Sequence, residues 1–166
     1  MLHPVLRACA LSVLLVSPPA ASAAQAAPVQ AAVTSALAPS AREAATVVDA
    51  FYAALRRGDT KAALAFLADS ALIFESGGVE RSKAEYASHH LAADAAFSKA
   101  VSSRLTRRAG AAAGNFAWIA SEGRASGTFR GRQIDQATAE TMVLRRTGAH
   151  WKIVHIHWSS AAAAGR

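Results

Sequence analysis

The chain has 166 residues, a formal net charge of +7 and a hydrophobic share of 52%. This length predicts one folded domain. The only cysteine, Cys9, lies in an apolar stretch near the N-terminus, so a disulfide framework, a cysteine nucleophile and a thiolate metal site are excluded from the folded domain. The excess charge comes from scattered arginine pairs without interleaved aromatic residues, which favours a solvated surface over nucleic-acid binding.

The first 23 residues have the layout of a secretory signal peptide. A weakly basic start with Arg7 precedes an apolar core over residues 5–16, and small residues end the segment at Ala21–Ala23. The core is shorter than the about 20 residues that span a bilayer. We therefore expect cleavage after Ala23 and export to the periplasm or the medium, without stable membrane insertion. A retained anchor is the alternative.

Composition divides the remainder of the chain into three parts. Residues 24–41 are rich in Ala, Pro, Gln and Ser and carry no periodic pattern, which predicts a flexible tether. The folded domain is expected over residues 42–160. Residues 161–166 are expected to form a loose tail.

Helices are predicted in the first half of the domain. Apolar residues recur at helical spacing over 41–57, with Ser40 as the expected N-cap and Gly58 as the C-cap. A short helix is expected over 61–67. A longer one is expected from Ser82, with its capping partner Glu85, to about Ala100.

Strands dominate the second half of the domain. A short strand over 71–75 ends in the turn Ser76–Gly78, and four strands are then expected over 101–109, 116–124, 135–146 and 150–160. Segregated helices and hairpin-connected strands define the α+β class.

The last hairpin supplies the first candidate site. A two-residue turn at Gly148-Ala149 places Glu140 opposite His157, and a four-residue loop places it opposite His155. Directly opposed residues have Cβ atoms about 4.5–5.5 Å apart. A turn of odd length would introduce a bulge and change this register.

A carboxylate and two imidazoles on one inward face suggest acid–base chemistry. His155 or His157 would be the base and Glu140 its orienting partner, or the reverse. The apolar neighbours Met142 and Ile153 would line the same pocket. A structural ion pair with no reaction is the alternative.

The long predicted helix carries the second cluster. His89 and His90 are adjacent, and Asp94 lies four residues after His90, where it can fix the imidazole tautomer. If this helix packs on the sheet, Tyr86 and His90 would line the pocket. We expect no cofactor, but zinc or copper bound by His89 or His90 together with His155 and His157, and with Glu75 or Glu140 as a carboxylate ligand, is an alternative.

Two tryptophans have different expected positions. Trp118 lies in a strong strand and is expected to line the ligand pocket, with packing in the core as the alternative. Trp158 has the opposite strand parity to His155 and His157. The face on which it is expected is apolar enough that another protein surface should pack against it. We therefore predict a homodimer through the outer sheet face, including Trp158.

Several segments together resemble the nuclear transport factor 2-like superfamily, in its SnoaL-like bacterial branch. These segments are the helix Val47–Leu55, its Arg57–Asp59 end, the strand Glu140–Arg145 and the closing strand Trp151–Ser160. The resemblance covers about residues 42–160. It implies a cone: a curved antiparallel sheet wrapped round the N-terminal helices and open to a pocket.

Members of this superfamily include ketosteroid isomerases, polyketide cyclases, dehydratases and non-catalytic binding domains, so the fold does not fix the function. The aspartate base and the tyrosine–aspartate oxyanion hole of the isomerases match no positions here, and no catalytic residue is carried over. The leading hypothesis is a pocket for a small, apolar or carbonyl-bearing molecule, with proton-transfer activity if the protein is an enzyme. A histidine-based metal-binding protein and a non-catalytic dimeric module are the alternatives.

Overall fold

The computed structural model describes residues 34–163, and the predicted signal peptide lies outside them. In chain order the elements are β1 (Thr34–Leu37), the 3-10 turn η1 (Pro39–Ala41), α1 (Arg42–Arg57), α2 (Thr60–Phe66), β2 (Leu67–Glu75), β3 (Gly78–Glu80), α3 (Lys83–His89), α4 (Leu91–Ala100), β4 (Val101–Ala113), β5 (Phe116–Phe129), β6 (Arg132–Thr147) and β7 (His150–Ala162). No helix within residues 34–163 is long and apolar enough to cross a membrane.

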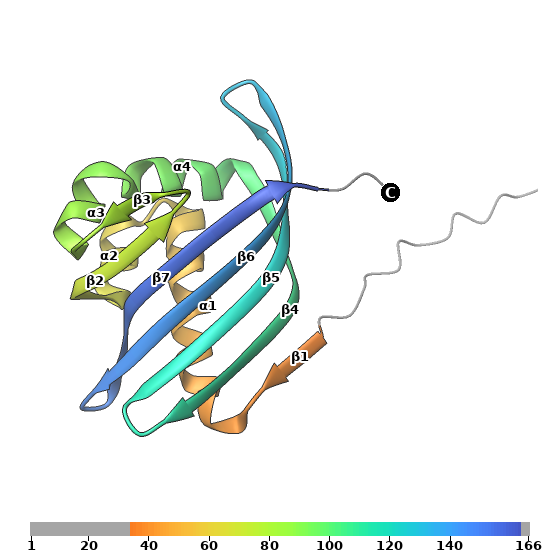
Figure 1. Ribbon diagram of the computed structural model, residues 1–166. Coiled ribbons are helices and arrows are strands. Elements are labelled where there is room, and N and C mark those ends of the chain that lie inside the picture. The colour runs from red at the N-terminus through yellow and green to blue at the C-terminus, as the bar shows by residue number, and fades with distance from the viewer. Residues whose placement is uncertain (1–33, 164–166) are drawn as a thin grey trace, which may run out of the picture. The chain divides into compact units, whose positions relative to one another are not determined.

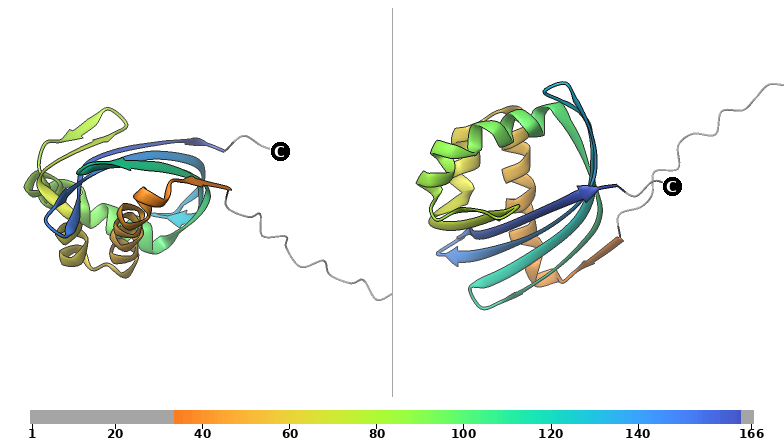
Figure 2. Two further views of the ribbon diagram at one scale, coloured as in Figure 1. Left: turned by 90° about the horizontal axis from the view of Figure 1, so that it is seen from below. Right: turned by 45° about the horizontal axis from the view of Figure 1, so that its top comes forward.

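The strands form one curved sheet in the order β1-β4-β5-β6-β7-β2-β3, and the helices lie on one side of it (Figures 1 and 2). The four long strands β4 to β7 pair antiparallel through hairpins, as predicted. The shorter strands β1 and β2 pair parallel with β4 and β7, and β3 pairs antiparallel with β2 at the edge of the sheet. The predicted α+β class, with a curved sheet round N-terminal helices, is confirmed.

The predicted C-terminal end of the first helix is confirmed, and its predicted N-terminal cap is not. Gly58 caps α1 in the left-handed conformation with φ of 72°, as predicted. Ser40 does not cap the helix, because it belongs to η1 and its hydroxyl lies 3.4 Å from the Ala112 carbonyl. The end of the expected tether is also structured, since Thr34–Leu37 form β1 alongside β4.

The long helix predicted up to Ala100 is divided at His90 into α3 and α4. Its predicted start is confirmed, because the Ser82 hydroxyl accepts a hydrogen bond from the Glu85 amide at 3.0 Å. The division changes the direction of the chain next to the sheet. It separates the residues before His90, near β3, from Asp94 and Phe97, which line the main cavity described below.

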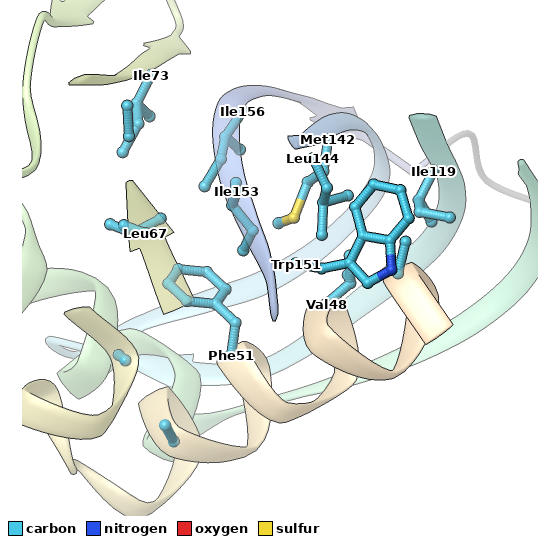
Figure 3. Close-up of a cluster of buried hydrophobic side chains, with 14 of the residues drawn as sticks. Val48, Phe51, Leu67, Ile73, Ile119, Met142, Leu144, Trp151, Ile153 and Ile156 are labelled. Carbon is cyan, nitrogen blue, oxygen red and sulfur yellow. The ribbon is translucent and has the colours of Figure 1, made fainter. Parts of the chain in front are cut away.

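The core lies between α1 and the inner face of the sheet (Figure 3). Val48 and Phe51 of α1 are fully buried and point towards β5, β6 and β7. They meet a layer of buried side chains from the strands. These are Leu67, Ile73, Ile119, Met142, Leu144, Trp151, Ile153 and Ile156. Truncating a buried side chain of this size costs about 2–5 kcal/mol, so this contact fixes α1 on the sheet.

The β6–β7 hairpin contains a β-bulge. It begins with the predicted two-residue turn, Gly148-Ala149, and its register is the predicted one as far as Leu144 opposite Ile153. Val154 then has no partner, and pairing resumes one residue later on β7. An extra residue on one strand of an antiparallel pair inverts the faces of everything beyond it.

The bulge makes the predicted register of Glu140 wrong. Glu140 lies opposite Trp158, not opposite His155 or His157. Ile156 and Trp158 turn to the inner face, and the two histidines turn to the outer face. The prediction that Trp158 is part of the outer, dimer-forming face is therefore also wrong.

Deleting Val154 should remove the bulge without changing any strand pair, because Leu144 and Ile153, Val143 and His155, and Glu140 and Trp158 can all remain opposite each other. Ile156 and Trp158 should therefore stay on the inner face, and the free energy of unfolding should change by about 1 kcal/mol or less. Urea unfolding followed by circular dichroism measures this change. The control Val154→Ala keeps the bulge and should have a similarly small effect. In an unbulged strand the deletion would invert the faces of all residues beyond it and cost at least about 4 kcal/mol, so a loss of that size would contradict the assigned register.

Candidate active site

A row of side chains crosses the inner face of the sheet at one level. Strand pairing places Glu75 beside Trp158, Trp158 beside Glu140, Glu140 beside Ser121, and Ser121 beside Arg108. Neighbouring strands are about 4.8 Å apart, so Arg108 and Glu140 are separated by about 10 Å along the row. The row therefore has an acidic end and a basic end.

This row forms part of the wall of a cavity of about 300 Å³. The size is at the lower end of the range for small-molecule sites. The α1 residues Asp49, Tyr52 and Leu55 and the α4 residues Asp94 and Phe97 also line the cavity. Its walls thus combine apolar surface with charged and hydroxyl groups.

Three of these side chains form a hydrogen-bonded group. The Tyr52 hydroxyl donates to Oε2 of Glu140 and accepts from the Trp158 indole N–H at 2.7 Å. The indole N–H also lies 3.2 Å from the same Glu140 oxygen. Burial, followed by the charge of Glu140, holds the pKa of Tyr52 well above its ordinary value. Tyr52 therefore remains a hydrogen-bond donor at physiological pH.

A second group lies where α4 meets the end of β2. The hydroxyl of the buried Tyr86 donates to Oδ2 of Asp94 at 2.9 Å. Burial raises the pKa of Asp94, although the Tyr86 hydrogen bond and nearby His90 act against it. Burial and the charge of Asp94 raise the pKa of Glu75. The cavity is therefore lined by two carboxyl groups that are stronger bases than usual.

Asp94 has one oxygen available for a ligand. Within residues 34–163, Oδ1 of Asp94 makes no hydrogen bond to the protein, whereas Oδ2 is held by Tyr86. The Glu75 side chain makes no hydrogen bond within residues 34–163 and is exposed where it lines the cavity. The geometry thus gives an oriented, partly buried base and a second carboxyl group near it.

The predicted catalytic histidines do not join this site. His155 lies on the outer face, where its Nδ1 is 2.9 Å from the Leu72 carbonyl and its ring meets Phe74 edge-on at 5.2 Å. His157 is exposed on the same face and also neighbours Phe74. Of the three residues expected to act together, only Glu140 lines the cavity.

The predicted pocket residues are divided among three places. Met142 and Ile153 are fully buried beneath the cavity as core residues. Tyr86 and His90 line a smaller cavity of about 40 Å³, which Glu75 and Trp158 also border. Trp118 is 45% exposed on the outer face of β5, so its predicted place in the pocket is wrong.

The four histidines of the metal alternative do not come together. His89 and His90 both contact the carboxylate of Glu80, while His155 and His157 lie on the outer sheet face. Within residues 34–163, the one group of three possible metal ligands within reach of one another is Glu80, Glu85 and His89.

The sequence did not predict Tyr52 and Trp158 as cavity residues, offered Glu75 only as a carboxylate beside the histidines of the metal alternative, and placed Asp94 only as a partner of His90. Tyr52 is on the inward stripe of α1, where an aromatic residue is also expected for packing alone. Trp158 was assigned to the other face because the bulge leaves no signal in the sequence pattern.

The chain matches the SnoaL-like domain family over residues 44–163 and therefore belongs to it. Among solved structures, a candidate ketosteroid isomerase from Shewanella frigidimarina is 38% identical, with a TM-score of 0.67 over 70% of this chain and 94% of that one. A comparison with curated proteins found no match.

Two more distant structures share the fold. A candidate dehydratase of the NTF2-like family from Streptomyces avermitilis is 21% identical, with a TM-score of 0.63 over 75% of this chain and 97% of that one. A candidate calcium/calmodulin-dependent protein kinase II association domain from Xanthomonas campestris is 20% identical, with a TM-score of 0.66 over 79% and 96%. The fold is compatible with small-molecule binding and isomerase- or dehydratase-like activity.

Replacing Asp94 by Asn should stabilise the protein near pH 7. A carboxyl group whose pKa is raised by folding favours the folded state only while it is protonated, so the wild type loses stability as pH rises from about 3.8 through the raised value. Asn carries no charge to desolvate. The melting temperature of Asp94→Asn should exceed that of the wild type at pH 7, and the difference should shrink towards pH 4.

The control Asp135→Asn should behave in the opposite way. Arg124 lowers the pKa of the exposed Asp135, so its ion pair adds stability at neutral pH that is lost as pH falls through the lowered value. An Asp94→Asn variant that melts below the wild type at pH 7 would contradict the assigned environment of Asp94.

Proposed function

We propose that the cavity binds a small carbonyl-bearing molecule and catalyses transfer of a proton between two of its carbon atoms. One observation carries this proposal: Asp94 and Glu75, with raised pKa values, line the same cavity as apolar and hydroxyl groups. A carboxylate whose pKa is closer to neutral accepts protons from weak acids more readily. Membership of the SnoaL-like family supports this class of activity.

In the proposed step, Oδ1 of Asp94 removes a proton from a carbon next to the carbonyl. The electrons of the broken C–H bond form an enolate, and its negative charge lies on the carbonyl oxygen. Asp94 then returns the proton to a different carbon of the same molecule, and the carbonyl re-forms. The reaction is an isomerisation that consumes no other reactant and requires no cofactor.

The other cavity residues would position the ligand. Tyr52, Glu140 and Trp158 form a wall whose hydrogen bonds fix the aromatic surfaces in place. At the basic end, the guanidinium of the largely buried Arg108 contacts Asp49 at 2.7 Å and Ser121 at 3.2 Å. A ligand with an apolar body and an oxygen at that end matches this distribution. The volume of about 300 Å³ favours ligands of one or two rings, with a steroid as the upper limit.

The proposal is tested with β,γ-unsaturated cyclic ketones of one to four rings, incubated with the protein in heavy water. We expect conversion to the conjugated isomer with deuterium exchange, followed by absorbance and by proton NMR. Asp94→Asn should reduce the rate by at least about 100-fold, because general base catalysis typically contributes that much. Tyr86→Phe should raise the pKa of Asp94 and move the acid limb of the pH–rate profile upwards.

The matched control is Asp135→Asn, which changes a carboxylate outside the cavity and should leave the rate unchanged. Full activity in Asp94→Asn would overturn the assignment of the base. Failure of all the ketones to bind or exchange would overturn the proposed ligand class.

We further propose that the protein forms a homodimer through the outer face of its sheet. The exposed large apolar side chains of the described chain, Phe116 and Trp118, are both on this face, at 54% and 45% exposure. Strand pairing places Val143 beside Trp118 and continues the row to Leu72 through His155. The helices cover the other face, so a second copy is the occupant that fits this exposed apolar surface. The Xanthomonas association domain supports this idea through its fold alone.

Replacing Trp118 by Asp should convert the dimer to monomers, because it places an unpaired charge in the apolar contact. Sedimentation equilibrium measures the mass of both forms. Ala92→Asp, at an exposed position of α4 on the helical side of the sheet, introduces the same charge away from the outer face and should remain dimeric. A monomeric wild type, or a Trp118→Asp variant that stays dimeric, would contradict the interface.

We also propose that the protein is exported. This proposal is supported by the signal-peptide pattern over residues 1–23, which lie outside the described structure. N-terminal sequencing of the mature protein from its native host should begin after Ala23. A mature chain that begins at Met1 would overturn it.

A further inference from the structure

The junction of β3 and α3 holds three potential metal ligands outside the main cavity. Glu80 ends β3 and is only 4% exposed, which is rare for a carboxylate. Glu85 and His89 are four residues apart on α3, so they share one face of the helix. The helix therefore presents a carboxylate and an imidazole next to a buried carboxylate from the adjacent strand.

The spacing of these groups suits a small cation. One ligand atom from each of the three residues lies within 4.8 Å of the other two. Oε2 of Glu80 and Nδ1 of His89 are 3.3 Å apart. Two ligands of a tetrahedral zinc ion, at bond lengths of about 2.0–2.2 Å, are separated by about 3.4 Å. The Glu80–His89 pair already has this separation, and the ligand oxygen of Glu85 lies within 4.8 Å of both partners.

Both carboxylates are also oriented by a second contact. Oε1 of Glu80 contacts Nδ1 of His90, which leaves Oε2 directed at His89. Oε2 of Glu85 accepts a hydrogen bond from the Arg81 amide at 2.6 Å, which leaves Oε1 for a cation. Outer contacts of this kind typically hold the ligands of a metal site in place.

We propose that Glu80, Glu85 and His89 bind a zinc ion, with water as the fourth ligand and His90 as the orienting partner of Glu80. Nitrogen and oxygen donors in a set of three are typical of zinc. The site does not depend on the proposed activity, because Glu85 and His89 do not line the main cavity. A bound ion would tie the β2–β3 hairpin to α3.

A simple ion pair between Glu80 and a protonated His89 is the competing explanation. It needs no third residue, whereas zinc needs Glu85. The exposed Arg81 guanidinium, 3.8 Å from Oε1 of Glu85, would have to move aside for the ion. Removal of the Glu85 charge therefore distinguishes the two explanations.

The test uses the chain without an affinity tag, stripped with a chelator and titrated with zinc chloride by calorimetry. We expect one zinc ion per chain and a higher melting temperature when zinc is present. His89→Ala and Glu85→Gln should each weaken binding at least about tenfold. His150→Ala removes an exposed histidine at the start of β7 and should bind as the wild type does.

Circular dichroism of each variant establishes that the helix is intact before titration. A wild type that takes up no zinc overturns the proposal. Unchanged binding in both His89→Ala and Glu85→Gln, or binding that is lost in His150→Ala, would place the ion elsewhere and overturn it equally.

Discussion

The inner face of the sheet depends on the β-bulge at Val154, where β7 has one residue more than β6 between paired positions. Before the bulge, Ile153 packs in the core beneath α1; beyond it, Ile156 and Trp158 take up the inward positions. Bulges often redirect side chains next to functional sites. Here the change of face brings the Trp158 indole to the Tyr52 hydroxyl and Glu140, so a single backbone irregularity sets the composition of the cavity wall.

The same arrangement joins stability to the proposed chemistry. Phe51 packs in the core on one side of Tyr52 and stacks with Trp158 at 6.5 Å, so α1 is held by apolar contact and by the Tyr52 hydrogen bonds together. Asp94, in contrast, is costly to keep charged in its partly buried place. A group that reduces the stability of the fold while increasing basicity is typical of a functional site, where stability is exchanged for reactivity.

Much of the fold could be predicted because it follows from local patterns. The stripe over residues 41–57, the Gly58 cap and the long alternating strands gave the α+β class and the hairpin order. The site could not be predicted equally well, because strand parity over 150–160 was extrapolated through a bulge. Glu140 was placed correctly on the inner face, but its partner was not. The basicity of Asp94 depends on its burial by segments that are distant in the sequence. Residue spacing along the chain does not predict that burial.

The inward position of Trp158 and its contact with Tyr52 can be measured directly from the indole N–H resonances in a ¹⁵N-correlated NMR spectrum. The account predicts that the Trp158 indole proton exchanges slowly with solvent, unlike that of the exposed Trp118. Tyr52→Phe should shift the Trp158 resonance and speed its exchange while the Trp118 resonance stays unchanged. A Trp158 indole that exchanges as fast as Trp118, with no response to Tyr52→Phe, would contradict the bulged register and the cavity built on it.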